Sequence, residues 1–231
     1  DLDGAKKHID GASIRGEGAI VSYVRGNIAA NQGHLKAALS YYNEAIDTDP
    51  THVRARLNRA SIHMASGNAQ GALDDSNILL ELAPGLALAK LRRAEANMML
   101  SNWNESKTDL KQIVESAPHH HHALTQLAAC YISMERPEKA ESPLNEALRL
   151  APDHTDAWHQ RGLLYLDWGR EEAALNDFEA AVRCNGNHLD ARLHIAAIHH
   201  EAGRFVEASG AWKGVLAIEP DHTVARRRRE E

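Results

Sequence analysis

The spacing of prolines constrains this chain more than any other feature of its sequence. Five of the seven prolines share one register, with successive intervals of 34, 34, 34 and 68 residues: Pro50, Pro84, Pro118, Pro152 and Pro220. Gly186 stands where the long interval would be halved. Proline cannot continue a helix, because it lacks the backbone N–H and clashes with the preceding turn. A fixed period of this length indicates a repeat protein whose units bury their cores against one another.

Repeats counted from Ala19 share columns of small and apolar residues. The eighth position of each repeat is Gly or Ala, the twentieth is Ala or Ser, and the twenty-eighth is Ile, Leu or Val. Two helices approach to ~8–10 Å only where their side chains are small, and the apolar column supplies the core. A left-handed residue commonly ends a helix, and glycines stand at the expected turn inside four repeats: Gly33, Gly67, Gly169 and Gly203. The pattern predicts two antiparallel helices per repeat, with breaks near each proline and near Gly186.

The fifth repeat shows a known signature most completely. It carries Trp158, Gly162, Tyr165, Ala174, Phe178 and Ala181. In these residues the chain resembles the tetratricopeptide repeat family, and the resemblance extends over nearly the whole sequence. It implies an all-α fold, an α-solenoid whose helix-turn-helix repeats coil into a right-handed superhelix. Six repeats are then expected, at 19–52, 53–86, 87–120, 121–154, 155–188 and 189–222.

The third and fourth repeats depart from the pattern at their turns and in one helix. Ser101 and Glu135 replace the turn glycine in the third and fourth repeats. Pro143 lies inside the fourth repeat's second helix, where we expect a local kink or a late helix start.

The two ends of the chain also follow the register. Residues 1–18 hold Ala5, Ile9 and Ala12 in the pattern of a second helix, so we expect the second helix of a preceding partial repeat and a linker. Residues 223–231 are expected to start a further or capping helix. A half-repeat at one end and a stub at the other predict a fragment of a longer array.

Composition and motifs exclude several classes of function. The formal charge of −6 argues against a general nucleic-acid binder, which needs a basic field to displace counterions. The sequence contains no run of ~18 apolar residues, so no membrane insertion is expected. The sequence has no nucleophile elbow, phosphate-binding loop, H-E-x-x-H or C-x-x-C motif. We therefore expect no enzyme in this segment and no cofactor, with a cytoplasmic location slightly favoured.

The resemblance also predicts where a partner binds. In tetratricopeptide proteins the first helix of each repeat lines a concave surface, chiefly with its positions 2, 5, 6, 9, 12 and 13. Asn amides pair with the donors and acceptors of an extended backbone, and arginines such as Arg54 and Arg92 hold carboxylates. Carried onto this chain, the rule predicts a surface for another protein or peptide that includes Tyr23, Asn27, Asn31, Arg54, Leu57, Asn58, Leu91, Arg92, Gln126, His159 and His194.

Other interpretations of the same residues remain open. Asn27, Asn58 and Arg92 match part of the carboxylate clamp of the family's chaperone-binding members, but Tyr23 and Leu88 stand where lysines are needed, which argues against a co-chaperone. The polar positions could equally be solvated without a ligand. Zn²⁺-type ligands share helix faces in the pairs Asp156/His159 and Asp190/His194, yet exposed His and Asp are far commoner than metal sites, so we expect no metal.

The predicted role is therefore a protein-interaction scaffold or adaptor. The alternative is a substrate-recruiting or regulatory segment of a larger enzyme, such as a glycosyltransferase that carries a repeat array. Self-association through the open ends of the array is a third possibility.

Overall fold

The computed structural model describes residues 2–230, and the side chains of residues 17–228. This described part contains thirteen α-helices, one short 3-10 helix and no strand. Contacts divide the chain into two compact units, Asp1–Ile113 and Val114–Glu231. The division falls within the helix Trp103–Ser116.

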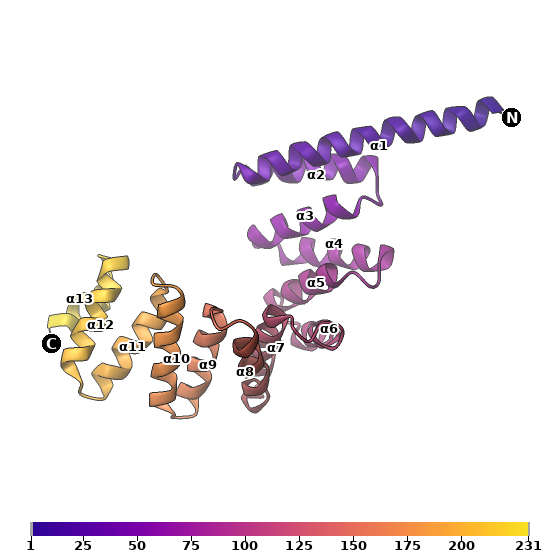
Figure 1. Cartoon of the computed structure of the whole chain (residues 1–231). Coiled ribbons are helices and arrows are strands. Elements are labelled where there is room, and N and C mark those ends of the chain that lie inside the picture. The colour runs from indigo at the N-terminus through magenta and orange to yellow at the C-terminus, as the bar shows by residue number, and fades with distance from the viewer. Residues whose placement is uncertain (1, 231) are drawn as a thin grey trace. The chain divides into compact units, whose positions relative to one another are not determined.

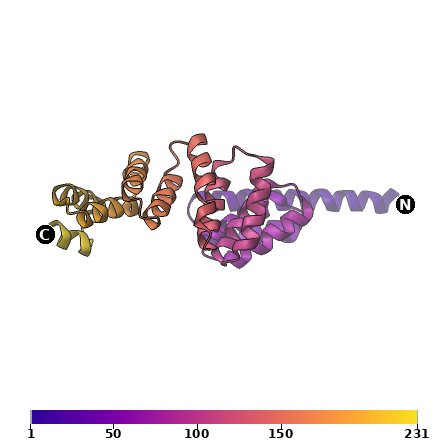
Figure 2. The same ribbon diagram turned by 90° about the horizontal axis from the view of Figure 1, so that it is seen from below.

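Each unit is a series of antiparallel helical hairpins (Figures 1 and 2). The first unit comprises α1 (Leu2–Asn31), α2 (Leu35–Thr48), α3 (Val53–Ala65), α4 (Ala69–Leu82), α5 (Ala87–Met99) and most of α6 (Trp103–Ser116). The second comprises α7 (His121–Ser133), η1 (Pro137–Lys139), α8 (Glu141–Leu150), α9 (Thr155–Asp167), α10 (Glu171–Cys184), α11 (Leu189–Glu201), α12 (Phe205–Ile218) and α13 (Thr223–Glu230). The all-α solenoid of hairpins is confirmed, and every predicted break falls between helices.

The N-terminal segment differs from the expected helix and linker. A single helix, α1, runs from Leu2 to Asn31 and continues through the position where the first repeat was expected to begin. The segment contains glycines but no proline, and a glycine inside a helix costs only about 1 kcal/mol, which weakens a helix without ending it. The side chains of Ala5, Ile9 and Ala12 lie outside the described residues.

The small columns lie at the crossing of the two helices of each repeat. Every residue at positions 8 and 20 is buried, and the alanines are at most 2% exposed. Where position 8 is glycine, an aromatic ring fills the vacated space. A methyl group on Gly26 would lie 2.5 Å from the ring of Tyr42, and one on Gly162 would lie 2.7 Å from the ring of Phe178. These glycines are therefore required for close packing and not for a turn.

Neighbouring repeats share a core across their boundary. Ala55 and Ile62 of α3 pack in one cluster with Ala45 and Ile46 of α2. The same arrangement recurs in the second unit, where Ala191 and Ile198 of α11 pack with Ala181 of α10. In these repeats a first helix thus packs against the second helix of its own repeat and that of the preceding one, as a solenoid requires.

A polar contact that the sequence analysis missed also recurs with the repeat. An arginine at position 7 donates to an aspartate at position 23 of its own repeat, and to an asparagine at position 25 of the preceding repeat. The contact therefore ties three helices together. The signal in the sequence is Asn, Arg and Asp at successive intervals of 16 residues: Asn43–Arg59–Asp75, Asn77–Arg93–Asp109 and Asn145–Arg161–Asp177.

Histidines cap several of the first helices. The Nδ1 atom of the histidine before the helix accepts a hydrogen bond of 3.1 Å from the third backbone N–H of that helix. Such a cap satisfies one of the donors that a helix start leaves unpaired. It occurs at α3, α7, α11 and α13, through His52, His120, His188 and His222. The repeat therefore accounts for part of the chain's high histidine content, including one member of the run at 119–122.

The turn inside each repeat keeps its left-handed residue even where glycine is missing. The four turn glycines have φ between +68° and +76°, and Ser101 and Glu135 adopt φ of +61° and +58° at the equivalent positions. The fourth repeat also shows the late helix start expected from Pro143. Its second helix, α8, begins at Glu141 after the 3-10 turn η1, four residues later than the second helices of the other repeats.

We predict that Ser101→Gly and Glu135→Gly each stabilise the protein. A left-handed conformation costs an L-residue about 1–2 kcal/mol, whereas glycine loses only about 0.5–1 kcal/mol more backbone entropy on folding. Each change should raise the free energy of unfolding by about 0.5–1 kcal/mol in urea titrations. The reverse change at a turn glycine, Gly169→Ser, should lower it; a stabilising Gly169→Ser would contradict the explanation.

A second prediction concerns the recurring ion pair. The side chain of Asp177 is only 5% exposed and accepts two hydrogen bonds of 2.7 and 2.8 Å from Arg161. Asp177→Ala leaves a poorly solvated guanidinium without its carboxylate partner and should cost about 3 kcal/mol of unfolding free energy. Glu146→Ala removes the partner of Arg149 in a well-exposed pair and should leave the melting temperature unchanged. Equal effects of the two variants would show that burial does not determine the strength of these pairs.

Candidate functional site

The first unit brings together the three predicted binding asparagines. Asn27 and Asn31 of α1 and Asn58 of α3 line a pocket of about 400 Å³, together with Tyr42 of α2. The Oδ1 atom of Asn27 accepts hydrogen bonds from the Tyr42 hydroxyl at 2.9 Å and from Asn58 Nδ2 at 2.7 Å. Burial raises the pKa of Tyr42 and keeps its hydroxyl protonated as a donor. The network fixes both amides in one orientation.

The other predicted residues of the first unit differ in their availability. Tyr23 packs against the rings of Tyr42 and His52, with centroids 6.3 and 5.0 Å away, and Leu57 is half-buried. Leu91 is only 8% exposed and belongs to the core. These side chains therefore pack within the helices more than they extend from the surface of the first helices.

The two predicted carboxylate-binding arginines also differ. The Nη1 atom of Arg92 contacts Glu95 at 2.6 Å, so its charge is already paired within the same helix. Arg54 is exposed at the start of α3 and has no ion pair among the described side chains. Arg54 is accordingly the predicted arginine that remains free to hold an acidic group.

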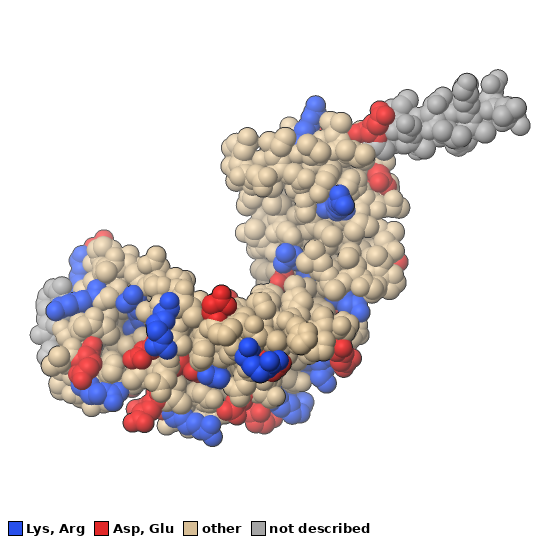
Figure 3. Space-filling view, viewed as in Figure 1, with Lys and Arg blue, Asp and Glu red and all other residues tan. Residues whose placement is uncertain are grey.

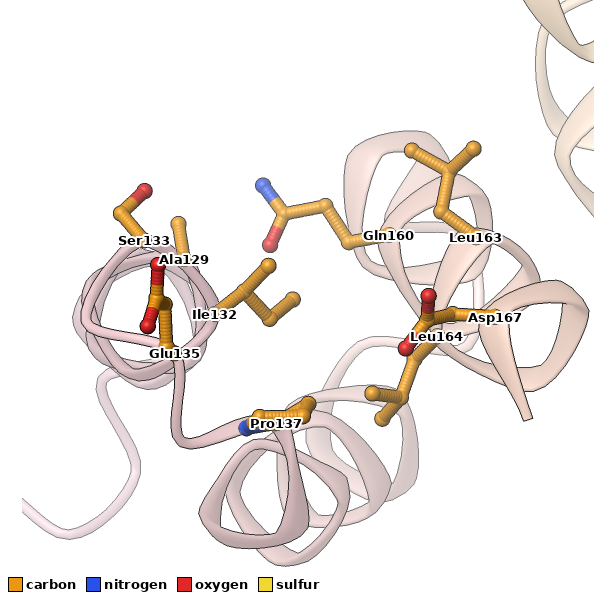
Figure 4. A pocket seen from close by; sticks show the side chains of 9 residues that line it. All are labelled: Ala129, Ile132, Ser133, Glu135, Pro137, Gln160, Leu163, Leu164 and Asp167. Atoms are coloured by element: carbon orange, nitrogen blue, oxygen red, sulfur yellow. The ribbon is translucent and has the colours of Figure 1, made fainter.

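The second unit contains a larger and more apolar pocket, shown in Figure 4. It has a volume of about 660 Å³ and lies between α7 and α9, with Pro137 of η1 at its edge. Ile132 of α7 and Gln160 of α9 point into it (Figure 4). The full lining is Ala129, Ile132, Ser133, Glu135, Pro137, Gln160, Leu163, Leu164 and Asp167.

The two pockets occupy equivalent places in different repeats. Each is lined by positions 9, 12 and 13 of one first helix and positions 6, 9 and 10 of the next. The chemistry differs at most of these positions: Asn27 corresponds to Ala129, Ala30 to Ile132, and Ser61 to Leu163. The surface predicted for repeats four to six contained polar side chains and omitted Ile132 and Leu163. Their repeat positions, 12 and 9, were sufficient to find them.

The predicted residues of repeats four to six do not form one polar surface. Gln126 lies on α7 beside His122, with 3.5 Å between Gln126 Nε2 and His122 Nε2. His159 and His194 pack instead around Phe178: His194 stacks on its ring at 4.7 Å, and the His159 centroid lies 5.7 Å from it. The two predicted histidines therefore take part in packing between the fifth and sixth repeats.

His188 completes this histidine cluster, and its ring centroid lies 4.7 Å from that of His159. Burial, followed by the neighbouring His188 and His194, lowers the pKa of His159 to about 4. Burial also lowers the pKa of His194. Within the described residues, no group of three or more His, Cys, Asp or Glu side chains is placed to hold a metal ion. His159 and His194 are thus neutral rings at physiological pH.

The two units differ in charge. Residues 1–113 contain 13 basic and 13 acidic residues, whereas residues 114–231 contain 13 basic and 19 acidic residues. The entire net charge of −6 therefore belongs to the second unit. On the face that Figure 3 shows, charged side chains are sparse over the first unit, and both signs are interspersed over the second. No helix within the described residues is long and apolar enough to span a bilayer.

The histidine cluster predicts loss of stability in acid. The unfolded His159 titrates near 6.5, but the folded ring resists protonation until about pH 4. Above pH 6.5 both states are neutral; as the pH falls toward 4, protons bind the unfolded state preferentially and stability decreases. His159→Phe should flatten the dependence of the melting temperature on pH between 6.5 and 4, whereas the same change at exposed His119 should not. An unchanged slope in His159→Phe would contradict the assignment.

Comparisons with known proteins identify the repeats of this chain as tetratricopeptide repeats. Two family models described as tetratricopeptide repeat match residues 23–87 and 127–194. No curated protein matches the sequence significantly.

Solved structures resemble the chain at low sequence identity. One is TTC0263, a thermophilic TPR protein in Thermus thermophilus, with 23% identity, a TM-score of 0.63 and coverage of 77% of this chain and 97% of that one. Another is YrrB, described as a TPR protein with an unusual peptide-binding site, with 20% identity, a TM-score of 0.58 and coverage of 82% and 98%. The APC/C hetero-tetramer Cut9–Hcn1 gives 17% identity and a TM-score of 0.78, covering 93% of this chain and 42% of that one. At these identities the likeness concerns the fold.

Proposed function

Since this chain belongs to the tetratricopeptide repeat family, we propose that it is a protein-interaction scaffold that binds an extended segment of a partner protein on the inner faces of its first helices. The observation that carries the proposal is the pair of equivalent pockets between successive first helices, one in each unit. A peptide-binding site is named for one similar structure, YrrB, which supports this use of the fold.

The chemistry of the first unit suits a polypeptide backbone. The Asn27–Asn58–Tyr42 network uses Oδ1 of Asn27 and Nδ2 of Asn58, which leaves a donor on Asn27 and an acceptor on Asn58. An extended backbone offers the complementary C=O and N–H groups at each residue. Because the amides are already oriented, binding requires little loss of side-chain entropy. Arg54, on the same helix as Asn58, supplies a free positive charge for an acidic group of the partner.

The proposal predicts where a bound partner lies. A photo-crosslinking residue at Ser61, in the first unit's pocket, should capture the partner from native extract. The same residue at Lys36, on the exposed face of α2, should not capture it. The Ser61 position tests the inner surface without removing any member of the asparagine network.

Affinity for the captured partner then provides the quantitative test. Arg54→Glu should weaken its binding at least about tenfold, since a charge-assisted hydrogen bond is worth about 1.5–3 kcal/mol. Lys36→Glu, a charge reversal of the same size on the second helix of its repeat, should change the affinity less than about twofold. Equal crosslinking at both positions, or equal loss in both variants, would contradict binding on the inner face.

A further inference from the structure

We propose that the pocket between α7 and α9 binds a partner segment in which an aliphatic side chain is adjacent to a lysine or arginine. The inference rests on the proposed function and specifies the chemistry that the second unit selects. Three features of the pocket support it: its apolar wall, its two carboxylates and a buried hydrogen-bond acceptor.

The apolar wall favours an aliphatic side chain. Ile132 and Leu163 are 36% and 37% exposed, and Leu164, only 2% exposed, closes the space behind them. In the first unit's pocket, the positions equivalent to Ile132 and Leu163 carry the small residues Ala30 and Ser61. The volume of about 660 Å³ is within the range of pockets that enclose ligands, ~300–1,000 Å³. An aliphatic side chain would remove the apolar wall from water.

The two carboxylates favour a basic neighbour. Glu135 follows α7 and Asp167 ends α9, so each helix contributes one acidic group to the lining. Neither has an ion pair among the described side chains, and both are exposed. A carboxylate in the last turn of a helix is disfavoured by the helix dipole, so Asp167 does not stabilise α9. The excess of acidic residues in the second unit adds a long-range attraction for a basic segment.

Gln160 adds a requirement for a hydrogen-bond donor. Its Oε1 atom is buried and has no hydrogen-bond partner among the described residues. A buried acceptor without a partner is costly, and such atoms in native proteins call for an explanation. Rotation of the Gln160 amide toward the pocket would present this oxygen to a backbone N–H or a lysine ammonium of the bound segment. An acidic side chain offers neither a donor nor a positive charge, and it would be repelled by Asp167.

The test is a selection of displayed peptides on the intact chain. A library of random peptides about twelve residues long is enriched for binding, and the selected peptides are then measured by fluorescence anisotropy against variants of the chain. We expect the enriched sequences to place Leu, Ile, Val or Met next to Lys or Arg. Asp167→Lys should weaken these peptides at least about tenfold, and Leu163→Ser and Gln160→Leu at least about threefold.

Matched controls in the second unit separate the pocket from general effects. Glu172→Lys reverses an exposed acidic residue of α10, and Val206→Ser replaces an 84% exposed apolar residue of α12. Both should leave the affinity within about twofold of the parent chain. Circular dichroism melting checks that each variant folds. A tenfold loss in Glu172→Lys would attribute binding to net charge and overturn the pocket assignment.

The outcomes distinguish this inference from the proposed function. Peptides that lose affinity with Arg54→Glu, but not with the Asp167, Leu163 or Gln160 variants, would support binding on the inner face and overturn the second pocket. An enriched acidic or purely apolar consensus, or an absence of enrichment, would also overturn it. Peptides indifferent to all of these variants would contradict both proposals.

Discussion

The two helices of each repeat cross where the first helix carries only glycine or alanine, and the rest of the structure depends on this close approach. Ala60, Ala94 and Ala128 at this crossing are completely buried. Where glycine stands instead, the second helix provides an aromatic ring, as Phe178 does against Gly162. The exchange keeps the interior filled, because the space that the glycine leaves is taken by the ring and has no room for a methyl group as well.

The regularity of the repeats explains why the polar contacts recur as well. The Asn–Arg–Asp contact needs three helices at fixed separations, and it is found at three places where the sequence supplies its residues. The histidine caps use the same geometry at the start of first helices. Both solve a general problem of stacked helices, which is that polar groups near the boundary lose water and need partners. The fold is thus stabilised by the close helix crossings at glycine and alanine and by the recurring Asn–Arg–Asp contacts and histidine caps.

Regular geometry also leaves the chemistry of the inner face free to vary. The pockets of the two units are lined by the same repeat positions, but one presents oriented amides and the other presents aliphatic side chains with two carboxylates. Substitutions at positions 6, 9, 12 and 13 change what a pocket can bind while the crossing of the helices stays the same. The difference in net charge between the units follows the same logic, because surface charge influences which partner binds and has little effect on the fold.

The sequence by itself determined the period, the helix breaks, the small columns and the late start of α8, because these depend on local residue chemistry repeated every 34 residues. It also identified Ser101 and Glu135 as unusual turn residues. Only the tertiary structure decided that Leu91 is buried and that His159 and His194 pack around Phe178. It likewise showed that α1 is continuous and that Ile132 and Leu163 form an apolar wall. The physical reason is that a side chain's exposure and partners depend on residues 16 to 34 positions away, which become neighbours only when the hairpins stack.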